Sequence, residues 1–182
     1  MSTASSPSIA GVATSLRKLY FVRFGFAVIW AVLVFSFGSE LGPVTATLLV
    51  LYPLFDLAAA IVDVRSNRAG ALLYINMALS LLAAVGLAIA ATSGTPAVLG
   101  VWGVWAITAG LVQLIVGIRR RKLGGQWVMI ISGGLSVPVG ASFLGLASGE
   151  PASVTTLGGY AALGGVFFLI SALRLGRTSK AL

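Results

Sequence analysis

The chain has 182 residues, of which 58% are hydrophobic and 9% are charged. This composition, gathered into several long apolar runs, argues against a water-soluble globular domain. The net charge of +8 would suit a nucleic-acid-binding protein. However, every basic cluster flanks an apolar run, where membrane topology already accounts for it, so no nucleic-acid partner is predicted.

Six apolar segments follow one another along the chain, each with about the 20 residues that a helix needs to cross roughly 30 Å of hydrocarbon. They are residues 20–38, 43–64, 69–91, 96–118, 126–147 and 153–175. The sequence therefore predicts an all-α polytopic membrane protein with six transmembrane helices in a membrane domain of residues 19–176. A short disordered cytoplasmic tail is predicted at 1–18, and a cytoplasmic tail at 177–182.

The basic residues are confined to the ends of these segments that face one side of the membrane. They are Arg17, Lys18, Arg23, Arg65, Arg68, Arg119, Arg120, Arg121, Lys122, Arg174, Arg177 and Lys180. The alternate loops carry Glu40 and Glu150 and no Lys or Arg. Because cytoplasmic loops retain basic residues, both termini are predicted to be cytoplasmic, with anionic lipid headgroups as partners of the basic face.

The six segments form three hairpins that repeat, over residues 20–64, 69–118 and 126–175. A proline can open the second helix of each hairpin, where its missing N–H costs nothing: Pro43, Pro96 and Pro151. These prolines are 53 and 55 residues apart. One unit of about that length therefore occurs three times, and all three copies have the same orientation in the membrane.

Glycines mark a predicted helix-packing seam. Gly103, Gly110 and Gly117 recur every seven residues in the fourth segment, and Gly158 and Gly165 hold matching places in the sixth. Lipid gives helices no hydrophobic reason to associate, so small residues that permit close approach favour packing at these positions.

Two carboxylates lie on one face of the second segment. Asp63 is within a turn of the cytoplasmic end, where Arg65, Arg68 or headgroup water can meet it. Asp56 is roughly 12 Å deep at helical rise, and a carboxylate there needs a partner, water or a proton.

Several polar side chains lie at a depth comparable to that of Asp56: Arg23, Asn76, Gln113 and Ser132. The sequence thus predicts a polar layer in the cytoplasmic half, with Arg23 and Asp56 as its charge pair. Two interpretations stay open. The layer is either a set of buried polar contacts between helices that fixes their register, or a site at which Asp56 takes up a proton or contacts an ion.

The chain contains no Cys and no His. It therefore lacks thiol nucleophiles, imidazole metal ligands and the triads that depend on His. It also has no P-loop, nucleotide fingerprint or paired-carboxylate spacing. Neither a metal, a cofactor nor an enzymatic reaction is predicted.

The repeated hairpin resembles the HdeD-type family of bacterial short-repeat membrane proteins. The resemblance rests on residues 51–56, 102–110, 119–125 and 132–140, although Leu57 follows Asp56 where that family often has Gly. It implies a six-helix inner-membrane protein with a non-enzymatic role in acid or other stress tolerance, through the membrane, a second copy or another membrane protein. The alternative is a transporter or channel for a small solute, an ion or protons that uses Asp56.

Overall fold

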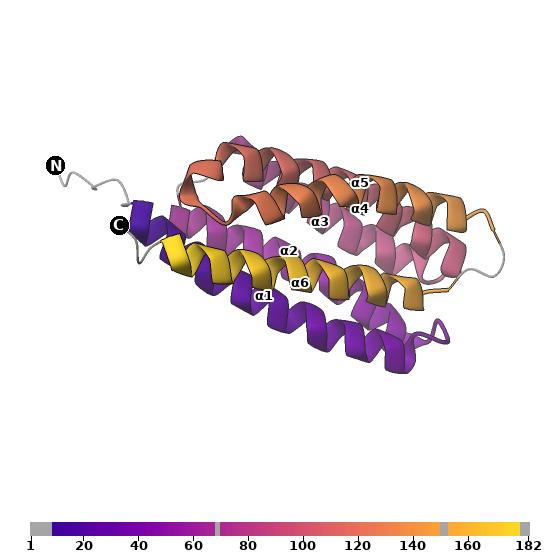
Figure 1. Cartoon of the computed structure of the whole chain (residues 1–182). Coiled ribbons are helices and arrows are strands. Elements are labelled where there is room, and N and C mark those ends of the chain that lie inside the picture. The colour runs from indigo at the N-terminus through magenta and orange to yellow at the C-terminus, as the bar shows by residue number, and fades with distance from the viewer. Residues whose placement is uncertain (1–8, 68–69, 150–152, 179–182) are drawn as a thin grey trace.

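The computed structural model describes residues 9–67, 70–149 and 153–178, and this part of the chain folds into six long helices (Figure 1). They are α1 Ile9–Phe37, α2 Pro43–Asn67, α3 Ala71–Ala90, α4 Thr95–Arg119, α5 Gln126–Leu146 and α6 Thr155–Thr178, with a short 3-10 turn, η1 Arg121–Leu123, between α4 and α5. All six helices are long and apolar enough to cross a membrane. The predicted all-α, six-helix membrane fold is confirmed.

Helix α1 begins earlier than the sequence suggested. It starts at Ile9, so the disordered tail predicted for 1–18 is wrong from residue 9 onward. Ala13, Leu16 and Tyr20 are buried in a cluster with Phe168 and Leu175 of α6. This tertiary contact stabilises a helical start whose Ser, Ala and Thr content looked like a tail. At the other terminus α6 continues to Thr178, two residues into the predicted tail, and 179–182 lie outside the described residues.

The helices form a closed ring. Each packs against its neighbours in the chain, and α1 also packs against α6. The most extensive contacts are α4 with α5, α1 with α6 and α2 with α3, which join different predicted hairpins rather than the two helices of one hairpin. The three sequence repeats are therefore embedded in one bundle and do not pack as three separate units.

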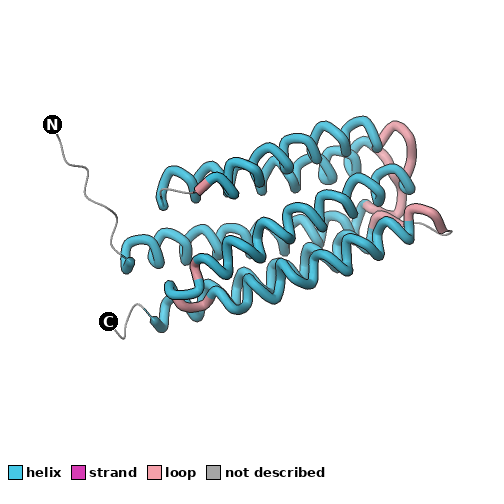
Figure 2. The backbone as a smooth tube through the Cα atoms, turned by 90° about the horizontal axis from the view of Figure 1, so that it is seen from above, coloured by secondary structure: helices cyan, strands magenta, loops and turns pink. Residues whose placement is uncertain are grey.

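The two ends of the bundle differ in charge. The start of α1, the end of α6 and the η1 connection lie together at one end of the bundle (Figure 1), and Figure 2 shows the turns that follow α1, α3 and α5 at the opposite end. We call the first the basic end. Its described charged side chains include Arg17, Lys18, Arg65, Arg119, Arg120, Arg121, Lys122 and Arg174. The described loops at the other, neutral end carry Glu40 and no Lys or Arg.

The predicted glycines divide between two separate contacts. Gly103, Gly110 and Gly117 of α4 face α5. A Cβ added to Gly103 would lie 2.7 Å from the carbonyl oxygen of Gly140, and one added to Gly110 would lie 2.5 Å from the Cβ of Ser136. Backbones this close leave no room for a side chain.

The glycines of α6 face α1 instead. A Cβ on Gly158 would lie 3.1 Å from the ring of Phe35, and one on Gly165 would lie 3.2 Å from the Cβ of Ala27. The α4–α5 contact also uses Gly133 and Gly140 of α5, which lie outside the predicted seam.

The interior on the neutral side is filled by aromatic rings. Trp30 of α1 stacks on Trp102 of α4 at 5.4 Å between ring centroids, and Tyr52 and Trp105 pack against Trp102 at 5.4 and 5.3 Å. Trp30 and Trp102 are almost completely buried. This aromatic layer closes the centre of the bundle between the polar side chains described next and the neutral end.

Candidate functional site

Asp56 of α2 is the centre of a buried polar cluster. Its side chain forms an ion pair with Arg23 of α1 through Nη2 and Oδ1. Its second oxygen, Oδ2, accepts hydrogen bonds from Asn76 Nδ2 and Ser80 Oγ, each at 2.7 Å. Asn76 and Ser80 are four residues apart on α3, so both project from one face toward the same carboxylate. We call Arg23, Asp56, Asn76 and Ser80 the polar cluster.

Two aromatic side chains extend the polar cluster to other helices. Trp105 Nε1 of α4 donates to Ser80 Oγ at 3.3 Å. The guanidinium carbon of Arg23 lies 4.5 Å from the ring centroid of Phe168 on α6, a cation–π arrangement. The polar cluster and its contacts thus join α1, α2, α3, α4 and α6.

The charges of the polar cluster cancel. Asp56 is 6% exposed, and an isolated carboxylate at that burial would carry a large desolvation cost. Arg23 supplies the opposite charge, and both carboxylate oxygens have donors. A buried pair becomes tolerable when its geometry and its remaining hydrogen bonds are satisfied in this way.

A second ion pair lies nearer the basic end. Arg120 holds Asp63 through two hydrogen bonds, Nη1 to Oδ2 at 2.6 Å and Nη2 to Oδ1 at 3.1 Å. Asp63 is 7% exposed and lies near the basic end, as its position in the sequence predicts, and Arg120 at the end of α4 is a charge partner that the sequence did not indicate. The side chain of Arg65 is exposed, and Arg68 lies outside the described residues. The fork of one guanidinium on one carboxylate is the strong, oriented form of this interaction.

The other predicted members of the polar layer face the same interior without touching Asp56. Gln113 Nε2 donates to the carbonyl oxygen of Met129 at 3.2 Å and so bridges α4 and α5. Ser132 of α5 is buried beside it. Ser136, one turn further on, is 3.0 Å from the hydroxyl of Tyr160 on α6.

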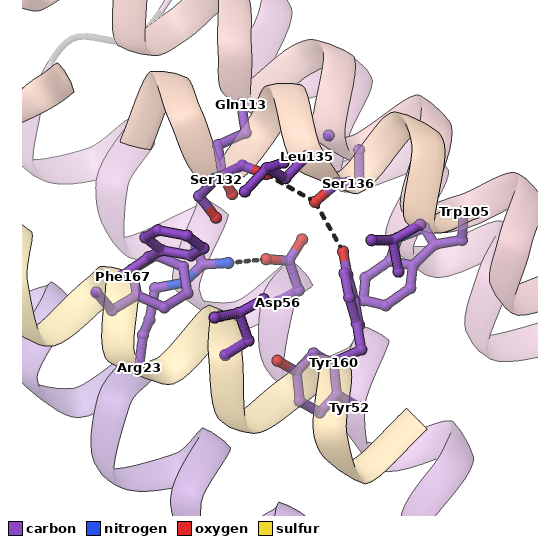
Figure 3. Close-up of a pocket in the computed structure, with 16 residues that line it drawn as sticks. Arg23, Tyr52, Asp56, Trp105, Gln113, Ser132, Leu135, Ser136, Tyr160 and Phe167 are labelled. Carbon is purple, nitrogen blue, oxygen red and sulfur yellow. Dashed lines mark hydrogen bonds and ion pairs between the residues drawn. The ribbon is translucent and has the colours of Figure 1, made fainter. Parts of the chain in front are cut away.

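Two small cavities meet at the polar cluster. The first, of about 70 Å³, extends toward α5 and α6, and Figure 3 shows its lining side chains around Arg23 and Asp56. The second, of about 80 Å³, extends toward the basic end as far as Asp63 and Arg120. We call them the lateral cavity and the inner cavity. Each has space and polar partners for water molecules.

Sequence reasoning missed Ser80, Trp105, Ser136 and Tyr160. A signal for Ser80 existed, because it follows Asn76 by one helical turn in an otherwise apolar segment. Trp105, Ser136 and Tyr160 had no such signal in the sequence, because aromatic residues and serines are common in membrane helices and the partners of these three lie on different helices.

The groups brought together can hold charge and hydrogen bonds in a buried space. Among residues 9–67, 70–149 and 153–178, no group of three or more His, Cys, Asp or Glu is arranged to hold a metal ion.

Comparison with known proteins finds no relative of the chain. No family model matches it, no curated protein matches it, and no solved structure matches it.

Proposed function

We propose that the chain is an HdeD-type protein of the bacterial plasma membrane, with both termini in the cytoplasm. Its role is in tolerance of acid or another stress, exerted through contacts with the membrane or with a partner, and it carries out no enzymatic reaction. Six membrane-length helices support the membrane part. The resemblance of residues 51–56, 102–110, 119–125 and 132–140 supports the family and the role.

One observation favours a structural role of Asp56 over transport. Both oxygens of Asp56 are held by fixed donors from α1 and α3. A carboxylate that serves as a proton or ion site must exchange partners during its cycle, whereas one that is fully satisfied keeps helices in register. The polar cluster is accordingly a connection between helices.

The charge of the bundle supports the orientation. Arg17, Lys18, Arg119, Arg121 and Lys122 are exposed at the basic end. Basic side chains at a membrane surface favour the cytoplasmic side and attract anionic headgroups, at about 1 kcal/mol for each Lys or Arg.

Two experiments test this function. Acid survival is measured in a bacterial strain without the gene, with and without a plasmid copy, and the proposal expects survival to fall in the first and recover in the second. The purified protein is then placed in liposomes across a panel of ion and pH gradients. Flux equal to that of protein-free liposomes is expected. Unchanged acid survival in the deletion strain would contradict the stress role.

The second candidate function is transport of protons or small ions. It is favoured by the lateral and inner cavities, which share Arg23 and Asp56 in their walls. If this candidate is correct, the liposomes show flux, and Asp56→Asn abolishes it without unfolding the protein, because Asn keeps the shape and loses the titratable group. Such flux would replace the proposal of a role through membrane or partner contacts.

A further inference from the structure

The lateral cavity opens sideways, toward the hydrocarbon of the membrane, between α5 and α6. Leu135 of α5 and Leu163 of α6 belong to its wall, and they are 42% and 46% exposed on the outside of the bundle. Of the six neighbouring helix pairs in the ring, α5 and α6 make the least extensive contact. A Cβ added to Gly164, another wall residue, would meet nothing within 4 Å. A molecule dissolved in the membrane can therefore reach this opening.

The floor of the lateral cavity holds donors that the protein does not use fully. A guanidinium carries five N–H groups. In the described structure Arg23 donates a hydrogen bond from Nη2 to Asp56 Oδ1, which leaves other N–H groups of the guanidinium for a ligand. Ser132 is buried, lies in the cavity wall, and its hydroxyl makes no hydrogen bond to the described residues. Arg23 and Ser132 approach the same space from α1 and α5 (Figure 3). A hydrogen-bond acceptor placed there would satisfy both.

The charge balance selects the kind of acceptor. Arg23 and Asp56 already neutralise each other, so an anion in the lateral cavity would leave a net buried negative charge in the membrane, which is costly. An uncharged oxygen brings no such cost. The walls beside the opening are apolar, with Leu135, Leu163 and Phe167, and suit a hydrocarbon chain.

We propose that the lateral cavity binds an uncharged, lipid-soluble molecule with a carbonyl-type oxygen as its head and a hydrocarbon chain as its tail. The head accepts hydrogen bonds from Arg23 and Ser132. A cavity of about 70 Å³ holds the head, and the chain lies in the α5–α6 opening against Leu135 and Leu163. A ketone, an ester and an un-ionised carboxylic acid share this chemistry. The site does not depend on the stress role of the protein.

The test uses a photoreactive ketone, decan-2-one carrying a diazirine on its chain, added to the full chain in lipid nanodiscs. After illumination, mass spectrometry locates the labelled residues. The expected labels concentrate on 132–139 and 160–168. An excess of decan-2-one removes them, and so does decanoic acid at a pH where its carboxyl is un-ionised, whereas decane does not, because it has no acceptor.

Two glycines of α6 provide a matched pair of variants. Gly164→Phe places a ring in the opening and should lower labelling about tenfold, whereas Gly159→Phe, also at a position where an added Cβ meets nothing within 4 Å, should leave it unchanged. Ser132→Ala removes one donor and should lower labelling about fivefold, the equivalent of roughly 1 kcal/mol for a hydrogen bond. If Gly164→Phe fails to fold, the labelling of Ser132→Ala alone tests whether the lateral cavity is the site.

Several results would overturn the proposal. Competition by decane equal to that by decan-2-one would mean that the opening is an apolar groove that does not bind the carbonyl-type oxygen. Labelling spread over all lipid-facing helices would mean that the ketone is not bound at one site on the protein. Unchanged labelling in both Gly164→Phe and Ser132→Ala would exclude the lateral cavity as the site.

Discussion

Ser80 shows how much of the polar cluster depends on side chains that look ordinary. Its hydroxyl donates to Asp56 Oδ2 and accepts from Trp105 Nε1, so Ser80→Ala removes one donor to the carboxylate and leaves a buried indole N–H without its acceptor. We expect a loss of about 1 to 2 kcal/mol in the free energy of unfolding, since hydrogen bonds between membrane helices are modest.

The matched control for Ser80→Ala is Ser142→Ala. Ser142 is exposed, and its hydroxyl donates within its own helix, to the carbonyl oxygen of Val139. Unfolding in a denaturing detergent titration measures both variants. Equal stability for the two would show that the hydrogen bond to Asp56 contributes nothing.

Arg119 and Arg120 are sequence neighbours with different environments. Arg120 holds Asp63 through two hydrogen bonds, whereas Arg119 is exposed. Arg120→Gln removes the guanidinium charge and the two hydrogen bonds that it gives to a buried carboxylate and should destabilise the bundle by about 3 kcal/mol, while Arg119→Gln should change stability by less than about 0.5 kcal/mol. Thermal unfolding in the same detergent compares them. A larger effect at Arg119 would contradict the assignment of the pair.

At the scale of the helix, adjacent glycines in α5 make a sharp comparison. A Cβ on Gly133 would lie 2.6 Å from the backbone nitrogen of Leu114, whereas one on Gly134 would meet nothing within 4 Å. Gly133→Ala must therefore push α4 and α5 apart and should lower the melting temperature by several degrees. Gly134→Ala should keep or slightly raise it, since Ala favours helix over Gly. The same melting temperature for both variants would mean that α4 and α5 are not packed backbone to backbone.

The helices themselves could be predicted from the sequence because a membrane span is a local property. Length and apolarity set it, and the predicted segment 126–147 differs from α5 by one residue. The start of α1 could not be predicted this way, because Ala13 and Leu16 are helical on account of their packing against α6. A contact between the first and last helices leaves no trace in either segment alone.

The sequence predicts the candidate site only as far as the depth of each residue in the membrane determines which residues can meet. Asp56 and Arg23 are placed at one level by counting residues from the helix ends, and they form the ion pair expected there. Depth does not say which helices are neighbours. Gln113, at the same level, therefore bonds to Met129 and not to Asp56, and Asp63 pairs with Arg120, which lies 57 residues away.

For the whole molecule, the orientation in the membrane is a prediction that the Cys-free chain makes easy to test. Single Cys residues at Ser39, Thr95 and Ser148, near the neutral end, should react with an impermeant thiol reagent added to intact cells. Cys at Asn67 or Gly124 should not, because basic loops stay in the cytoplasm. The reverse pattern would place both termini outside.

The central claim is that the ion pair of Arg23 and Asp56 holds the bundle together, and a double-mutant cycle tests it most directly. Asp56→Asn leaves Arg23 charged and buried, and Arg23→Gln does the same to Asp56, so each should cost about 3 kcal/mol or more in unfolding free energy. The double variant Asp56→Asn with Arg23→Gln should recover part of that loss, giving a coupling of about 1 to 3 kcal/mol. Losses that simply add in the double variant, or single variants as stable as the native chain, would contradict the account.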